Sequence, residues 1–201
     1  MASKTEIANL AISHLGTGKD IANLDTENSQ EANACRRFYE TALREVLRDF
    51  AWPFATKFAE LALVESDPTT EWSYSYRYPS EAVNIRRIFS NLRHDTRQSR
   101  IEFKIGHDDS GLLIYCDEPT PCAEYTEYVT NVEIYPRDFQ MMLALLLAAY
   151  IAPRVTGGDP YQMGERALKF YNLKLDIAKN NSKNEEQALE EPKSEYERER
   201  M

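Results

Sequence analysis

The residue types that bind metals or act as nucleophiles are few in this chain and stand far apart. The three histidines fit no H-E-x-x-H or similar zinc pattern, and no two cysteines have the C-x-x-C spacing of a tetrahedral site. An odd number of cysteines without a close pair favours reduced, buried thiols over disulfides. We therefore expect no metal and no cofactor. The residues concerned are His14, His94, His107, Cys35, Cys116 and Cys122.

Two short motifs resemble ligand sites but have simpler explanations. Gly16-Thr17-Gly18-Lys19 lacks the upstream glycine and the following Ser or Thr of a phosphate-binding loop, so it fits better as a helix end with its glycine stop. Asp108-Asp109 could hold a cation, but aspartate is also a favoured residue in a turn between strands, and we prefer the turn. A nucleophile and its base meet only in the fold, and no pattern here indicates such a pair. We expect that the chain is not an enzyme.

The segment 86–104 is a basic island in an acidic chain. It carries six cations against only Asp95 and Glu102, whereas the whole chain has a net charge of −9. Such a segment could bind an acidic protein surface or nucleic acid phosphates, or its arginines could pair with neighbouring carboxylates in a solvated loop. The sequence leaves these three possibilities open. The cations are Arg86, Arg87, Arg93, Arg97, Arg100 and Lys104.

Aromatic residues alternate with polar ones from Trp72 to Tyr78, which predicts a strand with one aromatic face. Such a face could stack bases, but it is more often the inner face of a β core, and we expect the core. Further short strands are expected at 58–63, 83–89, 101–105, 111–116 and 123–129. Residues 57–132 are therefore predicted to form a mainly antiparallel β subdomain.

The elements around these strands are predicted to be helices. Residues 141–152 run without a charge or a strong polar group, and their Met, Leu and Ala content favours a helix covered on all sides. The run is shorter than the ~18 residues that cross a bilayer, so we expect a core helix and no membrane contact. Pro136 suits its first position, and Pro153 followed by Thr156-Gly157-Gly158 is expected to stop it.

Two amphipathic helices precede the strands, at 4–15 with Ser3 as N-cap and at 30–50 with Ser29 as N-cap. A last helix is expected from Pro160 to about residue 180, with Asp159 as its N-cap. Its core face is predicted to contain Met163, Ala167, Phe170, Tyr171, Leu173 and Ile177. We therefore expect an α+β fold with about four helices: a helical core at 1–56 and 133–180, and the β subdomain inserted between its halves.

Residues 181–201 carry four basic and seven acidic groups and almost no large apolar residue. Such a segment cannot order itself alone, so we expect a flexible charged tail whose Leu189 and Tyr196 could bind a groove on a partner. The N-terminal residues lack the basic flank and apolar run of a signal peptide, which predicts a cytoplasmic site of synthesis. The negative net charge argues against general adhesion to DNA or anionic lipid.

The ordered set of features resembles the head-to-tail connector (adaptor) proteins of tailed bacteriophages, including the tail tubular protein A type. The resemblance covers about residues 1–180, and Tyr78-Pro79-Ser80-Glu81 departs from it where the family has Leu-Pro followed by an Asp-Cys-like pair. The matching stretches are 7–11 (Ile-Ala-Asn-Leu-Ala), 31–54 with its Asp49-Phe50-Ala51-Trp52-Pro53-Phe54 ending, 74–79 (Tyr-Ser-Tyr-Arg-Tyr-Pro), 139–153 and Thr156-Gly157-Gly158.

The resemblance implies a non-enzymatic virion protein of the neck, assembled in the host cytoplasm as a homo-oligomeric ring of about twelve copies. It implies the portal protein and the next tail component as partners, and DNA passing through the ring without sequence-specific binding. The alternative is a nucleic-acid-binding or packaging accessory protein that uses the basic segment Arg86 to Lys104. An enzyme of unknown type is a third possibility that no motif supports.

Overall fold

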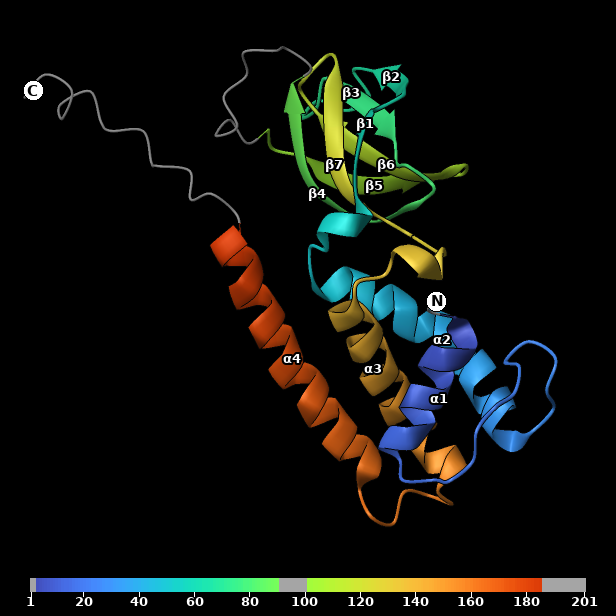
Figure 1. Ribbon diagram of the computed structural model, residues 1–201. Coiled ribbons are helices and arrows are strands. Elements are labelled where there is room, and N and C mark those ends of the chain that lie inside the picture. The colour runs from blue at the N-terminus through green and yellow to red at the C-terminus, as the bar shows by residue number, and fades with distance from the viewer. Residues whose placement is uncertain (1–2, 91–100, 186–201) are drawn as a thin grey trace, which may run out of the picture.

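The computed structural model describes residues 3–90 and 101–185 (Figure 1). Two helices open the chain, α1 (Lys4–His14) and α2 (Gln30–Asp49). Each begins at the expected serine cap, because the Ser3 hydroxyl accepts the Glu6 N–H at 3.1 Å and the Ser29 hydroxyl accepts the Ala32 N–H at 3.2 Å. The glycine stop after α1 is also confirmed, since Gly16 has a φ of 70°.

The long apolar stretch forms α3 (Arg137–Val155), which packs against α1, α2 and α4 (Met163–Glu185) (Figure 1). Phe139, Leu143 and Leu147 are completely buried there, so the predicted core helix is confirmed. Pro136 is its N-cap, not its first helical residue. The helix ends at Val155, directly before the expected Thr156-Gly157-Gly158 stop, but Pro153 itself lies inside α3, and the Thr156 N–H still donates to the Ala152 carbonyl oxygen at 2.9 Å.

The last helix differs from the expectation at both ends. It begins at Met163, not Pro160, because Asp159 has a φ of 58° and caps the helix from outside it. The Asp159 carboxylate accepts the N–H groups of Met163 and Gly164 at 2.7 and 2.8 Å. The helix also continues to Glu185, past the expected end at 180.

Among the described residues, seven antiparallel strands lie between the helix pairs in sequence. They form a three-stranded sheet in the order β1-β7-β4 and a four-stranded sheet in the order β2-β3-β6-β5. Two short 3-10 helices, Pro53–Ala55 and Val132–Ile134, connect this region to α2 and α3. The strands are β1 (Thr56–Glu60), β2 (Leu63–Ser66), β3 (Tyr74–Arg77), β4 (Ala82–Ser90), β5 (Lys104–Asp108), β6 (Gly111–Cys116) and β7 (Pro121–Glu127).

The fifth strand lies three residues later than predicted. Asp109 and Ser110 form a two-residue turn that pairs Asp108 with Gly111, and this turn sets the register of β5 on β6. Ile101, expected inside this strand, makes only an isolated bridge to Ile88. The preference for a turn at Asp108-Asp109 is confirmed.

The molecule has two hydrophobic clusters. One fills the space between the helices, and the other lies between the two sheets, where Tyr76 of β3 is 1% exposed and packs with residues of both sheets. The expectation that the aromatic strand contributes to a β core is confirmed at Tyr76. The α+β fold with four helices and antiparallel strands between them is likewise confirmed for the described residues.

Candidate functional site

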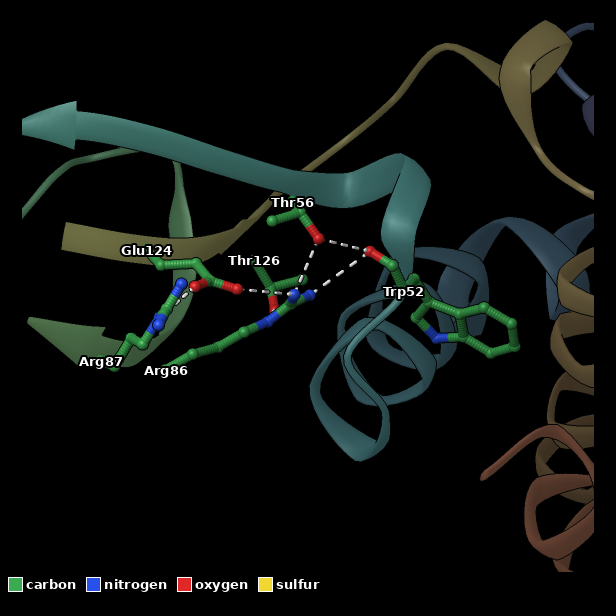
Figure 2. Close-up of polar contacts among 6 residues, drawn as sticks. All are labelled: Trp52, Thr56, Arg86, Arg87, Glu124 and Thr126. Carbon is green, nitrogen blue, oxygen red and sulfur yellow. Dashed lines mark hydrogen bonds and ion pairs between the residues drawn. The ribbon is translucent and has the colours of Figure 1, made fainter. Parts of the chain in front are cut away.

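The first two cations of the basic segment lie where the β region joins the helices. Arg86 on β4 donates through Nε to the Thr126 hydroxyl at 3.0 Å and through Nη1 to the Thr56 hydroxyl at 2.7 Å (Figure 2). Its Nη2 donates to the Trp52 carbonyl oxygen at 3.3 Å. The side chain is only 15% exposed. Arg86 thus ties β4, β7 and β1 to the segment that leaves α2.

Trp52 carries this connection into the helical core. Its indole N–H donates to the Val46 carbonyl oxygen of α2 at 2.8 Å. Its ring meets Phe139 of α3 edge-on, with ring centroids 5.0 Å apart. Trp52 therefore connects Arg86, which binds its carbonyl oxygen, to residues of both α2 and α3.

Arg87 binds the same carboxylate that Arg86 approaches. The Arg87 Nε donates to Glu124 on β7, whose other oxygen lies 3.8 Å from Arg86 Nη1 (Figure 2). Consecutive residues on a regular strand point to opposite faces. Here the register shifts between Ile85 and Arg87, and this irregularity lets both arginines reach Glu124.

Of the other predicted partner-binding residues, the structure describes only Lys104. Lys104 at the start of β5 is exposed, with its ammonium 4.0 Å from the carboxylate of Glu71. The remaining five lie outside the described residues, so their predicted role stays a prediction. They are Arg93, Arg97, Arg100, Leu189 and Tyr196.

Two tyrosine–carboxylate contacts, which the sequence did not indicate, hold α2 to the last two helices. The Tyr150 hydroxyl of α3 donates to Glu45, and the Tyr171 hydroxyl of α4 donates to Asp49 at 2.6 Å. Burial and the Glu45 carboxylate raise the pKa of Tyr150 to about 12. The only signal in the sequence was the spacing of Glu45 and Asp49, one turn apart on the same face of α2.

The cysteine thiols are largely withdrawn from solvent, because Cys35 and Cys116 are buried and Cys122 is half-buried. Burial raises the pKa of the Cys35 thiol to about 12, and within residues 3–90 and 101–185 no three His, Cys, Asp or Glu side chains gather as a metal site would require. His14 lines a pocket of about 210 Å³ between α1 and α4, where burial lowers its pKa. This pocket is small, and half of the residues that line it are apolar, among them Met163 and Phe170.

Three apolar residues of α4 that were predicted to lie in the core are exposed on the described surface. Phe170, Leu173 and Ile177 are 45%, 57% and 45% exposed, and we call these three residues the α4 stripe. The prediction that they face the core is wrong, because α3 covers only the neighbouring face. That buried face consists of Ala167, Tyr171 and Leu175. Contiguous exposed apolar side chains are typical of interaction surfaces.

Comparisons with known proteins add no family. No protein-family model matches this chain, and no curated protein matches it. By length and composition α3 could cross a bilayer, but 56% of its apolar window is buried inside the protein. The geometry thus provides a contact between the strands and the helical core at Arg86 and an uncovered apolar face on α4.

Proposed function

We propose that this chain is a structural protein of the bacteriophage neck, a head-to-tail connector that forms a ring between the portal and the tail. The observation that carries the proposal is the α4 stripe, a row of apolar side chains left uncovered on a helix that packs against α3 along a neighbouring face. A subunit of an oligomer needs such a surface, whereas an isolated monomer gains nothing from exposing it. The ordered sequence features that resemble the connector family support the same proposal.

The joint at Arg86 supports this role in a second way. A subunit that contacts different neighbours with its helices and with its strands must keep the two regions in a fixed relation. Arg86 is held within the strands by Thr56, Thr126 and Glu124, and its hydrogen bond to the Trp52 carbonyl oxygen links the strands to the helices. In the proposed ring, these contacts would hold the portal-facing and tail-facing surfaces in register.

The acidic character of the chain suits a ring through which DNA passes. A net charge of −9 repels phosphate, whereas a basic lining would hold the duplex through multiple salt-sensitive contacts. The alternative, a nucleic-acid-binding accessory protein, would need the basic segment to be available. Arg86 and Arg87 are engaged by Thr126, Trp52 and Glu124, so a phosphate would have to displace these partners.

Quantitative mass spectrometry of purified phage particles tests the proposal. With the portal protein as internal standard, we expect about twelve copies of this chain per particle, as the resemblance implies. Particles assembled without the chain should be filled heads that lack tails. A chain that is absent from mature particles, or present only in trace amounts, would contradict a structural role in the neck.

A further inference from the structure

The α4 stripe has the dimensions and the charge of a docking site for a short acidic segment. Phe170, Leu173 and Ile177 are spaced three and four residues apart, so they lie on one face of α4 over about 10 Å. Leu168, also on α4 but 42% exposed, falls on the opposite flank of the buried face. The stripe is thus a defined row and not a general apolar coat on the helix.

Cations border this row. The Arg166 guanidinium lies over the Phe170 ring at 5.5 Å, and Lys174 is exposed beside the stripe, whereas Lys169 is exposed but forms an ion pair with Glu165 at 2.7 Å. Two α4 helices brought together along their stripes would therefore oppose like charges. An acidic partner with one or two apolar side chains would instead meet complementary charge as well as apolar surface.

The chain itself contains a segment of this chemistry. Residues 186–201 carry six acidic and three basic side chains, together with Leu189 and Tyr196 as the large apolar ones. We propose that segment 186–201 of one copy binds the α4 stripe of a second copy. The inference rests on the proposed ring in one respect, since both require more than one copy of the chain.

A second copy is favoured over the chain's own α4 by the sequence around the helix end. A tight reversal at a helix C-terminus commonly uses glycine at the position that needs positive φ. The last glycine of this chain is Gly164, at the other end of α4. Segment 186–201 would therefore have to reverse direction without a glycine after α4 ends at Glu185 to reach its own stripe, whereas the stripe of a neighbouring copy requires no such reversal.

Disulfide trapping between full-length chains tests the contact. Leu173→Cys protein is mixed with Leu189→Cys protein under mild oxidation, and covalent dimers are quantified on a non-reducing gel. We expect at least tenfold more heterodimer than from a control mixture of Leu168→Cys and Leu189→Cys. The native thiols should contribute little background, because Cys35 and Cys116 are buried and burial raises the pKa of all three thiols. Lys174→Glu in the Leu173→Cys chain should lower the yield severalfold.

Each other outcome overturns the proposal in a recognisable way. Dimers from Leu173→Cys protein alone would show that two α4 stripes meet each other. An intrachain disulfide in the Leu173→Cys/Leu189→Cys double variant, without covalent dimers, would show that the segment binds its own helix. Equal yields of heterodimer from the Leu168→Cys and Leu173→Cys proteins would show that the chains are crosslinked by random collision and not by a specific contact. If the protein has the mass of a ring but no trapping occurs, only this contact fails; if it is also monomeric, the proposed function fails too.

Discussion

The guanidinium of Arg86 donates to the backbone carbonyl oxygen of Trp52, 3.3 Å away, at the point where the chain leaves α2 for the sheets. Trp52 is 4% exposed and belongs to the helical core, whereas Arg86 belongs to β4. One side chain therefore joins two regions with separate hydrophobic clusters. A shorter or apolar residue could not replace this arginine, because only its planar guanidinium reaches several acceptors at once.

Replacing this residue tests the joint. Arg86→Met keeps much of the apolar stem but leaves the Trp52 carbonyl and two threonine hydroxyls with fewer partners, so we expect a loss of about 2–3 kcal/mol in the free energy of unfolding. The matched control is Arg87→Met, one residue along the strand and 38% exposed, for which a loss of about 1 kcal/mol or less is expected. Urea unfolding followed by tryptophan fluorescence measures both. Equal losses would show that Arg86 has no special role.

The core position of α3 gives a second prediction. Leu146 is 1% exposed, and Leu146→Asp would bury a carboxylate without a partner, so we expect destabilisation of about 4 kcal/mol or more. Leu168→Asp on α4 is the control, since this side chain is 42% exposed, lies outside the α4 stripe and remains hydrated. Thermal melting by circular dichroism compares the two variants with the parent. A Leu146→Asp protein that melts like the parent would mean that α3 is not the core.

Local signals in the sequence were sufficient for the starts of α1 and α2 and for the fold class. Ser3 with Glu6, and Ser29 before α2, act over three residues, so their hydrogen bonds form as the sequence predicts. The registers of longer-range elements could not be predicted in this way. The position of β5 depends on its pairing with β6, in which Ile105 lies opposite Ile114, and not on its own apolar residues.

The candidate site shows the same limit more strongly. The partners of Arg86 come from 40, 30 and 34 residues away in the chain, so the sequence could not decide between a cation available to a partner and one engaged within the protein. On α4 the periodicity correctly indicated a wide apolar face. Which part of that face is covered depends on where α3 lies, and only the structure shows that Leu173 and Ile177 remain exposed.

The stability of the protein in acid should depend on the ion pair between Arg77 and Asp108. Arg77 donates to both oxygens of Asp108 at 2.8 Å, and this contact lowers the pKa of the Asp108 carboxyl to about 2, from an ordinary value of 3.8. Because the folded state has the lower pKa, the pair stabilises the fold above about pH 4 and loses its effect as the pH falls toward 2.

Replacement of either partner should therefore flatten the stability profile in this window. Asp108→Asn and Arg77→Met are each expected to melt below the parent at pH 6 and to approach it near pH 2. Thermal melts from pH 2 to pH 6 measure the difference. Profiles that run parallel to that of the parent over the whole range would show that the pair does not couple to folding.

Binding to duplex DNA separates the proposed neck protein from its alternative. At about 150 mM salt we expect no complex tighter than the micromolar range in a gel shift, because the net charge is negative and Arg86 and Arg87 are occupied. Lys104→Glu should then change nothing. A nanomolar Kd that Lys104→Glu weakens would instead favour the nucleic-acid-binding accessory protein.

The mass of the purified protein, alone and mixed with its portal protein, tests the central claim most directly. Native mass spectrometry or light scattering should give a species close to twelve times the chain mass of 23.2 kDa, either by itself or only when the portal is present. In both cases the chain and the portal should elute together. A chain that stays monomeric at every concentration and does not bind the portal would contradict the proposed connector.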